Sequence, residues 1–245
     1  MTKFKLIKLD AIGSTNDWLK NKFQSGNCQD GCVVWAMNQT KGRGQYSNVW
    51  SSESRKNLTF SVFKRISGIN SGESFLINCA VTLAIIETLE KFKIPNLKIK
   101  WPNDILSADK KIGGVLIENI INGKKLNASI SGIGINVNQK SFINLPFAGS
   151  MFLQTNKKYD LNKVFDELLD KLDLFFDLLE KPDKFHLLSS FEKSMYKKGE
   201  WCHFKADGCI FFGRIMGVSN HGLLIIEKKS KKVNQYSNGG VEMIY

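Results

Sequence analysis

The chain has 245 residues, 42% of them hydrophobic and 24% charged, which excludes wholesale disorder and leaves enough apolar residues for a sizeable core. No apolar run approaches the roughly 18 residues that span a bilayer, so we expect no membrane association. The 35 basic residues exceed the 23 acidic ones by 12, but most are lysines spread along the chain, and the sequence therefore predicts no specific binding to DNA.

The first quarter of the chain predicts strands, a helix and a long loop. Residues 4–9 suit a strand, and Ser14 then precedes apolar residues at helical spacing, which indicates a capped helix. Residues 31–37 form a buried-looking strand, with 58–63 as its hairpin partner. We interpret the polar stretch 38–57 between them as a long loop.

The middle of the chain predicts a buried helix and a hairpin. Residues 74–92 are apolar nearly all round and contain no Gly or Pro, which is typical of a helix packed deep against a sheet. Three strand candidates follow, at 97–101, 111–120 and 126–138. The Asn-Gly turn at residue 122 joins the last two, so we expect them to pair as a hairpin.

The pattern changes near residue 197. Residues 160–180 predict a strongly amphipathic helix, and Pro182 begins a second helix that runs to about residue 196. Beyond it, Gly-containing turns separate short apolar runs, as in a small β-barrel; the runs are 200–204, 209–216, 222–227 and 241–244. We therefore predict an α+β fold with two domains, a mixed or antiparallel sheet with packed helices at 1–196 and a small C-terminal β-barrel at 197–245.

The first candidate site is the segment that starts at Gly42-Arg43-Gly44 and ends at Trp50. The two glycines permit close approach to a ligand, and Arg43 is suited to pairing with a phosphate or carboxylate. The segment lacks the third glycine of a Rossmann motif and the Gly-Lys-Ser/Thr of a Walker motif. An ordinary mobile loop remains the alternative.

The second candidate site combines Lys100-Trp101-Pro102-Asn103-Asp104 with Lys111-Ile112-Gly113-Gly114. Lys111 opens a strand that runs into two glycines, which places its ammonium group at the rim of a sheet on which a ligand can lie flat. A cation there suits the joint neutralisation of a carboxylate and a phosphate. The alternative is a solvated lysine beside structural glycines, with Asp104 closing the turn.

The third candidate site is the Gly-Ile-Gly-Ile-Asn segment that ends at Asn136. Gly132 and Gly134 alternate within a strand, which is costly unless a ligand or another backbone approaches closely. The amide of Asn136 is then available to a polar group. A bulge in a curved sheet is the alternative interpretation.

The order and spacing of these motifs, from Ser14-Thr15-Asn16 to the C-terminal runs, resemble the biotin protein ligase (biotin–acetyl-CoA-carboxylase ligase) family. The resemblance implies the catalytic fold of biotin and lipoate ligases, which is like that of class II aminoacyl-tRNA synthetases, plus an SH3-like barrel. It also implies that biotin and ATP with Mg²⁺ give biotinyl-5′-AMP and pyrophosphate, and that a lysine of a biotin carboxyl carrier protein then takes the biotinyl group.

The resemblance assigns roles to individual residues. Lys111 would lie between the biotin carboxylate and the α-phosphate as the main catalytic residue, and Arg43 would close its loop over both. The residues implied for biotin are Ser14, Thr15, Asn16, Gln39, Gly42, Arg43, Gly44, Gln45, Lys111, Gly114 and Gly132. Those implied for ATP or the adenylate are Arg43, Gln45, Asn48, Trp50, Lys100, Asn103, Lys111 and Asn136. No metal ligand is assigned, because Mg²⁺ is inferred only from the use of ATP.

The chain departs from the commonest loop of the family, in which further basic residues follow Gly-Arg-Gly. Gln45, Ser47 and Asn48 stand there instead, so two loop charges are missing and more of the phosphate contact falls to Arg43 and Lys111. Two other functions stay open: a lipoate or octanoate ligase or transferase of the same fold, and a non-catalytic module that binds biotin or nucleic acid.

The remaining expectations concern the setting of the protein. The ligase motifs begin close to Met1, which suggests the monofunctional class without an N-terminal DNA-binding domain. The N-terminus lacks a secretory signal, and the five cysteines cannot all pair and lack the partners of a zinc site. We therefore expect a cytoplasmic protein with reduced cysteines, either a monomer or a homodimer.

Overall fold

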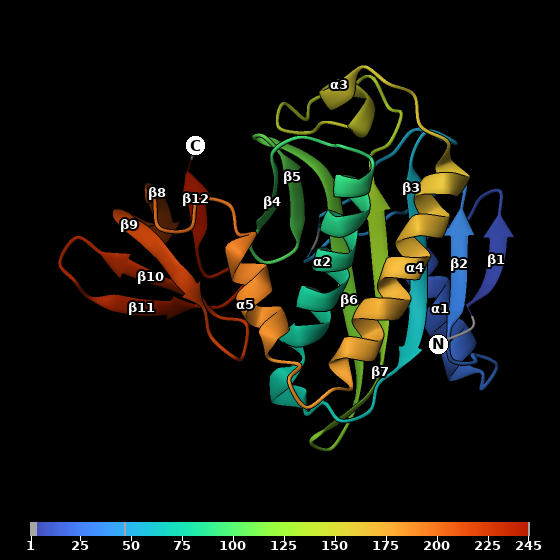
Figure 1. Cartoon of the computed structure of the whole chain (residues 1–245), viewed down its shortest axis with the longest axis horizontal. Coiled ribbons are helices and arrows are strands. Elements are labelled where there is room, and N and C mark those ends of the chain that lie inside the picture. Colours follow the sequence, from blue (N-terminus) through green and yellow to red (C-terminus); the bar gives the residue numbers. More distant parts are fainter. Residues whose placement is uncertain (1–3, 47, 245) are drawn as a thin grey trace.

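The computed structural model describes residues 4–46 and 48–244, which form two sheets with helices on the larger one (Figure 1). The larger sheet has seven strands in the order β1-β2-β3-β7-β6-β5-β4. Only β1 and β2 are parallel among its neighbouring pairs, so the sheet is mixed, and the two predicted hairpins, β2–β3 and β6–β7, are confirmed. The strands are β1 (Lys5–Leu9), β2 (Cys32–Ala36), β3 (Leu58–Arg65), β4 (Leu97–Lys100), β5 (Asp104–Ser107), β6 (Lys110–Asn122) and β7 (Lys125–Ile135).

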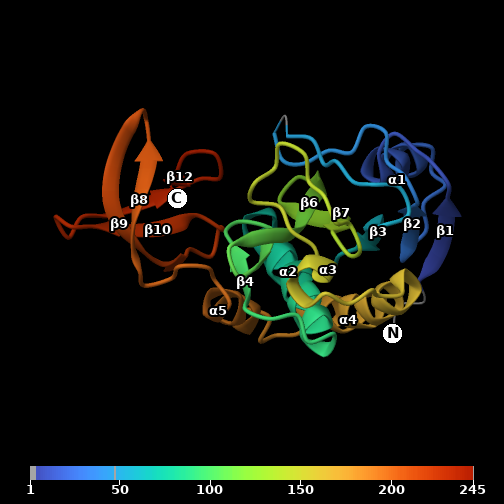
Figure 2. The ribbon, with the colours of Figure 1, turned by 90° about the horizontal axis from the view of Figure 1, so that it is seen from above.

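Helices cover both faces of this sheet (Figure 2). The predicted capped helix is α1 (Thr15–Gln24), which packs against β2, β3 and β7 on one face. On the other face lie α2 (Phe75–Lys91), α4 (Leu161–Leu179) and α5 (His186–Lys193). Two short pieces complete the set, η1 (Ser71–Glu73) and α3 (Met151–Thr155).

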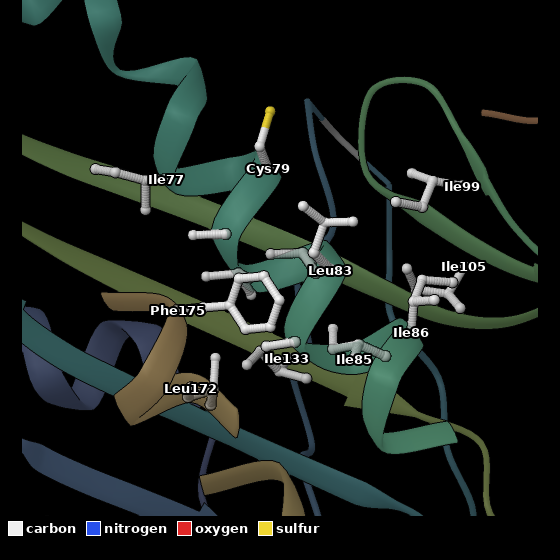
Figure 3. Close-up of a cluster of buried hydrophobic side chains, with 14 of the residues drawn as sticks. Ile77, Cys79, Leu83, Ile85, Ile86, Ile99, Ile105, Ile133, Leu172 and Phe175 are labelled. Atoms are coloured by element: carbon white, nitrogen blue, oxygen red, sulfur yellow. The ribbon is translucent and has the colours of Figure 1, made fainter. Parts of the chain in front are cut away.

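Helix α2 is the core helix that the sequence predicts. It is buried nearly all round because β4, β5 and β6 cover one side of it and α4 and α5 the other. Figure 3 shows its Ile85 and Leu83 among Ile133 of β7 and Phe175 of α4. The helical segment Ser71–Lys91 has the length and apolar composition of a membrane span, but 72% of its apolar window is buried inside the fold, as expected of a core helix.

The smaller sheet has five antiparallel strands in the order β11-β10-β9-β8-β12, beside the β4 edge of the larger sheet (Figures 1 and 2). The predicted all-β C-terminal part is thus confirmed, but β11 and β12 are the two edges of this sheet and no ladder closes it among the described residues. Both edge strands are short, which leaves few backbone groups for closure. The strands are β8 (Trp201–Ala206), β9 (Cys209–Val218), β10 (Leu224–Lys228), β11 (Val233–Tyr236) and β12 (Glu242–Ile244).

The two sheets share one hydrophobic core. Phe191 of α5 and Phe204 of β8 belong to the same cluster of buried side chains as Ile215 of β9. The boundary predicted near residue 197 falls between α5 and β8, and the division of the chain into two domains there stays a prediction.

Several elements differ from expectation. Strands β5 and β11 and helix α3 were not predicted, because each has only four or five residues and lacks a clear period. Helix α5 begins at His186 rather than near Pro182, since turns fill the intervening residues. Strand β7 ends at Ile135, three residues early, where the chain leaves the sheet.

Candidate active site

A cavity of about 450 Å³ opens between the larger and the smaller sheet. Of the residues that the family resemblance implies, the lining includes Ser14, Thr15, Asn16, Gln39, Arg43, Gly44, Gln45, Asn48, Trp50, Lys100, Asn103, Lys111, Gly114 and Gly132. Gly42 and Asn136 do not line it. Asn136 lines a second cavity of about 220 Å³ whose wall also contains Trp50 and Lys111. Lys111 therefore belongs to both cavities.

A β-bulge places Lys111 in this position. Gly113 pairs with Ile105 of β5 while Lys111 pairs with the next residue, Leu106, so Ile112 is an extra residue in β6. Side chains of a regular strand alternate between its two faces, so residues 111 and 114 would point to opposite faces. The extra residue of the bulge shifts this alternation, and Lys111 and Gly114 face the same cavity. The ammonium group of Lys111 lies 2.5 Å from Asp104 Oδ1, and this ion pair orients it at the rim of the sheet.

The glycines of β6 and β7 make room for side chains of the protein. A Cβ on Gly132 would collide with the Asn16 amide, and one on Gly134 would collide with the Trp50 indole. A Cβ on Gly114 would lie 3.2 Å from the Trp50 ring. The side chains of Asn16 and Trp50, rather than the predicted ligand or backbone, occupy the space over these two glycines. The alternative of a bulge at Gly132 and Gly134 is wrong, because both lie in regular register.

A buried polar cluster closes one end of the larger cavity. Thr15 donates from its backbone N (2.8 Å) and its Oγ1 (3.0 Å) to Gln39 Oε1. Ser61 of β3 donates through Oγ to Asn16 Oδ1 at 2.6 Å, and Asn16 Nδ2 donates to Glu118 Oε2 at 2.8 Å. Apart from the Glu118 carboxylate, the cluster consists of neutral donors and acceptors in a fixed arrangement, which suits a polar ligand without charge.

Sequence reasoning missed two members of this cluster. Ser61 is fully buried between Phe60 and Val62 of β3, and a polar residue between apolar neighbours in a strand is the signal that the sequence offers. Glu118 lies on β6 beyond the Gly-Gly pair. Ser14 is the N-cap of α1 and accepts a hydrogen bond from the backbone N of Asp17, so its interpretation as a helix cap is confirmed.

The Gly-Arg-Gly segment forms a small hairpin-like loop over the cavity. Trp50 N donates to Gly42 O at 3.0 Å, and Gly44 N donates to Asn48 O at 2.7 Å. A Cβ on Gly42 would collide with the Trp50 carbonyl, so this glycine serves the loop rather than the cavity wall. Ser47 lies outside the described residues.

Arg43 forms two ion pairs. Its Nη2 lies 2.6 Å from Asp17 Oδ1 of α1 and 2.9 Å from Glu118 Oε2 of β6. These contacts hold the start of the loop against the larger sheet. They also place the guanidinium group next to the polar cluster.

The second cavity has a largely apolar wall formed by the segment that precedes α3. Asn136 Nδ2 donates to Gly149 O at 2.9 Å, whereas its Oδ1 is buried without a hydrogen-bond partner. Such an orphaned acceptor is suited to a ligand donor. No sequence motif marks this segment, and its apolar residues in a stretch without regular period are the only signal that the sequence offers. The lining residues that it contributes are Phe142, Leu145, Pro146, Phe147 and Ala148.

The remaining predicted residues support the cavity floor. Asn103 is buried and donates through Nδ2 to the Val115 carbonyl of β6. Lys100 lies at the end of β4 on the cavity wall. Eight lining residues of the C-terminal part were not predicted, because contact between distant segments leaves no local pattern; they are Phe204, Ile215, Leu224, Asn238, Gly239, Val241, Glu242 and Met243.

The cysteines take no part in the site. All five are free thiols, and burial raises the pKa of Cys28 to about 12, with the neighbouring Cys32 contributing. A thiol with so high a pKa is a poor nucleophile at neutral pH. Within the described part of the chain, no group of three or more His, Cys, Asp or Glu is placed to hold a metal ion.

Comparison with known proteins identifies the family. The chain is 28% identical over 241 residues to the "Bifunctional ligase/repressor BirA" of Bacillus spizizenii, which covers 95% of this chain and 72% of that protein. It is 29% identical to the biotin–acetyl-CoA-carboxylase ligase of Mycobacterium tuberculosis over 68% of this chain and 63% of that one.

Among solved structures, the biotin protein ligase of Aquifex aeolicus in complex with biotin and ATP superimposes with a TM-score of 0.80. The two chains are 26% identical, and the match covers 98% of each. The family model described as "Biotin/lipoate A/B protein ligase family" matches residues 9–136, which contain every motif of the larger cavity outside the C-terminal part. The chain therefore belongs to the biotin/lipoate A/B protein ligase family, and its resemblance to the biotin protein ligases is confirmed.

Proposed function

We propose that this protein is an ATP-dependent biotin protein ligase that forms biotinyl-5′-AMP and transfers the biotinyl group to a lysine of a biotin carboxyl carrier domain. One observation carries the proposal: Lys111 lines both cavities, one polar at its end and one apolar. A cation at the junction of two binding sites is suited to joining two anionic substrates, because it cancels their repulsion as they approach.

The polar cluster suits the ureido head of biotin. That head offers two N–H donors and a carbonyl acceptor and carries no charge, which matches the amide and hydroxyl groups of Thr15, Asn16 and Gln39. In this arrangement the valeryl chain of biotin extends toward Lys111 and brings its carboxylate to the ammonium group. A lipoyl or octanoyl group has no ureido head and would form no such hydrogen bonds with these polar groups.

The second cavity suits the adenine ring of ATP. Its wall is apolar and includes the rings of Trp50 and Phe147, and the orphaned Oδ1 of Asn136 is an acceptor for an exocyclic amino group. The ribose and α-phosphate then point toward Lys111. Lys100 and Arg43 line the larger cavity and are placed for the phosphates and the adenylate.

In the first step a carboxylate oxygen of biotin attacks the α-phosphorus of ATP, and the bond to the β-phosphate oxygen breaks. The products are biotinyl-5′-AMP and pyrophosphate. Lys111 neutralises the carboxylate and the α-phosphate as they meet, and Asp104 holds the ammonium group in place. The loop that carries Arg43 excludes water from the mixed anhydride.

In the second step the neutral amine of the carrier lysine attacks the carbonyl carbon of the anhydride. The bond to AMP breaks, an amide forms, and the amine loses a proton to solvent. The protein contributes mainly position and the exclusion of water here.

Mg²⁺ would enter with the triphosphate. The carboxylates on the wall of the larger cavity are Asp104 and Glu242, and Asp104 already pairs with Lys111. This donor set fits a Mg²⁺ ion held mainly by phosphate oxygens, with Glu242 as the carboxylate of this wall that is not paired with Lys111. The ion would supply further neutralisation of phosphate charge.

The test measures pyrophosphate release with ATP and Mg²⁺ in the presence of biotin, lipoate or octanoate. We expect release with biotin only, and we expect Lys111→Ala to slow it about 10²- to 10³-fold. Lys98→Ala, which removes an exposed lysine of β4, is expected to leave it unchanged. Release with lipoate or octanoate instead would place the protein in the sister branch of the family. No release with any of the three acids would favour the non-catalytic binding module.

A further inference from the structure

The tip of the Gly42–Trp50 loop contacts the smaller sheet across the cavity. The hydroxyl of Tyr46 donates to the backbone carbonyl of Asn238, and Asn238 Nδ2 donates to Gln45 Oε1 at 2.6 Å. Asn238 lies between β11 and β12, more than 190 residues from its partners along the chain. The contact therefore joins the loop of one sheet to a turn of the other.

The turn of the smaller sheet is shaped to receive the tyrosine. Gly240 N donates to Ser237 O at 2.9 Å, which closes a four-residue turn with Asn238 and Gly239 at its centre. Gly239 has a φ of +79°, as the third residue of a type II turn requires. A Cβ on Gly239 would lie 2.8 Å from the Tyr46 hydroxyl oxygen. Glycine is thus required both by the backbone and by the contact.

The loop holds Tyr46 in an unusual conformation. Its φ is +55°, in the left-handed region that bulky residues rarely adopt. Its side chain is 71% exposed, so burial of the ring offers little compensation. Local strain of this kind persists only where surrounding contacts enforce it. Tyr46 makes such contacts with Asn238 and Gly239.

These contacts differ in kind from those at the start of the loop. Arg43 is held by two ion pairs, to Asp17 and Glu118, whereas the tip is held by hydrogen bonds between uncharged groups. Gln45 stands where the commonest family loop carries a basic residue. Because salt screens interactions between charges, hydrogen bonds between neutral groups depend less on ionic strength than the ion pairs of Arg43 do.

We infer that Asn238 is a positioning residue, and that Gln45, Tyr46, Asn238 and Gly239 form a latch that holds the loop closed. The hydrogen bonds from Gly44 to Asn48 and from Trp50 to Gly42 make the loop one unit, so a fixed tip also fixes Arg43 and Trp50. The smaller sheet then has a role in catalysis, which is to keep the loop over the bound adenylate. This consequence, though not the latch itself, rests on the proposed function.

The experiment compares the native chain with Tyr46→Phe and with the double variant Tyr46→Phe/Asn238→Ala. Gln235→Ala is the matched control, since it truncates an exposed residue of β11 beside the same turn. Hydrogen exchange of the Gly44 and Trp50 amides is measured without any ligand. The dissociation rate of enzyme-bound biotinyl-5′-AMP is measured separately. Tyr46→Phe removes a single hydroxyl group from an exposed residue, so it is expected to fold. The single variant therefore still tests the latch if the double variant does not fold.

We expect both rates to rise about fivefold in the double variant and about twofold in Tyr46→Phe, because a net hydrogen bond contributes a factor of about two to ten. The control is expected to match the native chain. Native exchange rates in the variants would overturn the latch, and faster exchange with unchanged dissociation would overturn its role in retention. Failure of the native chain to form any adenylate would count against the proposed function alone, because the exchange measurement needs no ligand.

Discussion

Lys111 Nζ lies 2.5 Å from Asp104 Oδ1, and the two residues stand on adjacent strands that a β-bulge has shifted by one residue. The side chain of Lys111 remains 38% exposed, so its ammonium group is held but still accessible to anions. The ammonium group of Lys111 is therefore held in position by one carboxylate and still has room to bind an anion.

Removal of the Asp104 carboxylate is expected to leave Lys111 in place but poorly oriented. We predict that Asp104→Asn lowers kcat for pyrophosphate release by about tenfold, at the lower end for loss of a charge-assisted hydrogen bond. Asp104→Glu is expected to restore part of the rate, which a merely structural defect would not allow. Unchanged kcat in Asp104→Asn would show that Lys111 needs no orientation by this carboxylate.

Arg43→Gly is expected to release the adenylate before transfer. The change removes both ion pairs that hold the start of the loop, together with the cation that we propose contacts the phosphate of the adenylate. Free biotinyl-5′-AMP then reacts with any lysine nearby, so labelling of unrelated proteins rises. Mass spectrometry of a protein mixture counts the lysines of unrelated proteins that become biotinylated. Arg55→Gly is the control, because it removes an arginine that is ion-paired outside the cavity. Unchanged acceptor specificity would contradict the role of Arg43.

Gly134→Ala is expected to displace Trp50. The new methyl group would occupy the space of the indole ring, and overpacking of this kind destabilises a fold by about 1 to 3 kcal/mol. Gly13→Ala is the matched control, because no atom lies within 4 Å of its Cβ position and its φ is ordinary. Tryptophan fluorescence and the urea midpoint report the two effects. An unchanged urea midpoint together with native fluorescence would mean that the fold accommodates the new methyl group beside Trp50 without loss of stability.

Glu73 links stability to pH. Its carboxylate accepts a hydrogen bond from the backbone N of Asn70 and pairs with Lys184, and these contacts, the backbone bond first, lower the pKa of Glu73 from 4.5. A lowered pKa stabilises the fold above the unfolded-state pKa, and this contribution is lost as the pH falls through the folded-state pKa.

We therefore predict that Glu73→Gln is less stable than the native chain at pH 7, and that the difference fades as the pH falls below about 4.5, the unfolded-state pKa. Urea unfolding between pH 3 and 7 measures it. A difference that stays constant over that range would show that the carboxylate charge has no part in it.

The periodic elements could be predicted because burial imposes a period on the sequence. Helix α2 is surrounded by apolar neighbours and α4 is covered on one side, and their residue patterns report this directly. Strands β5 and β11 could not be found, since four residues beside a turn carry too little pattern. Their existence depends on the neighbours with which they pair.

The candidate site was predictable where its residues lie in short motifs. Fourteen implied residues gather on the wall of one cavity, because the motifs sit at strand ends that meet between the two sheets. Two contacts join segments that are distant in the sequence: the ion pair of Arg43 with Asp17 and the hydrogen bond of Tyr46 with Asn238. Such contacts cannot be predicted from a local sequence pattern. The same holds for the apolar wall around Phe147.

The most direct test of the account is the single-turnover formation of biotinyl-5′-AMP from biotin and ATP by the native chain and by Lys111→Ala. If Lys111 joins the two substrates, the native chain forms one equivalent of adenylate, and the variant still binds biotin but forms adenylate about 10²- to 10³-fold more slowly. Adenylate formation by Lys111→Ala at the native rate would contradict the central role of this lysine.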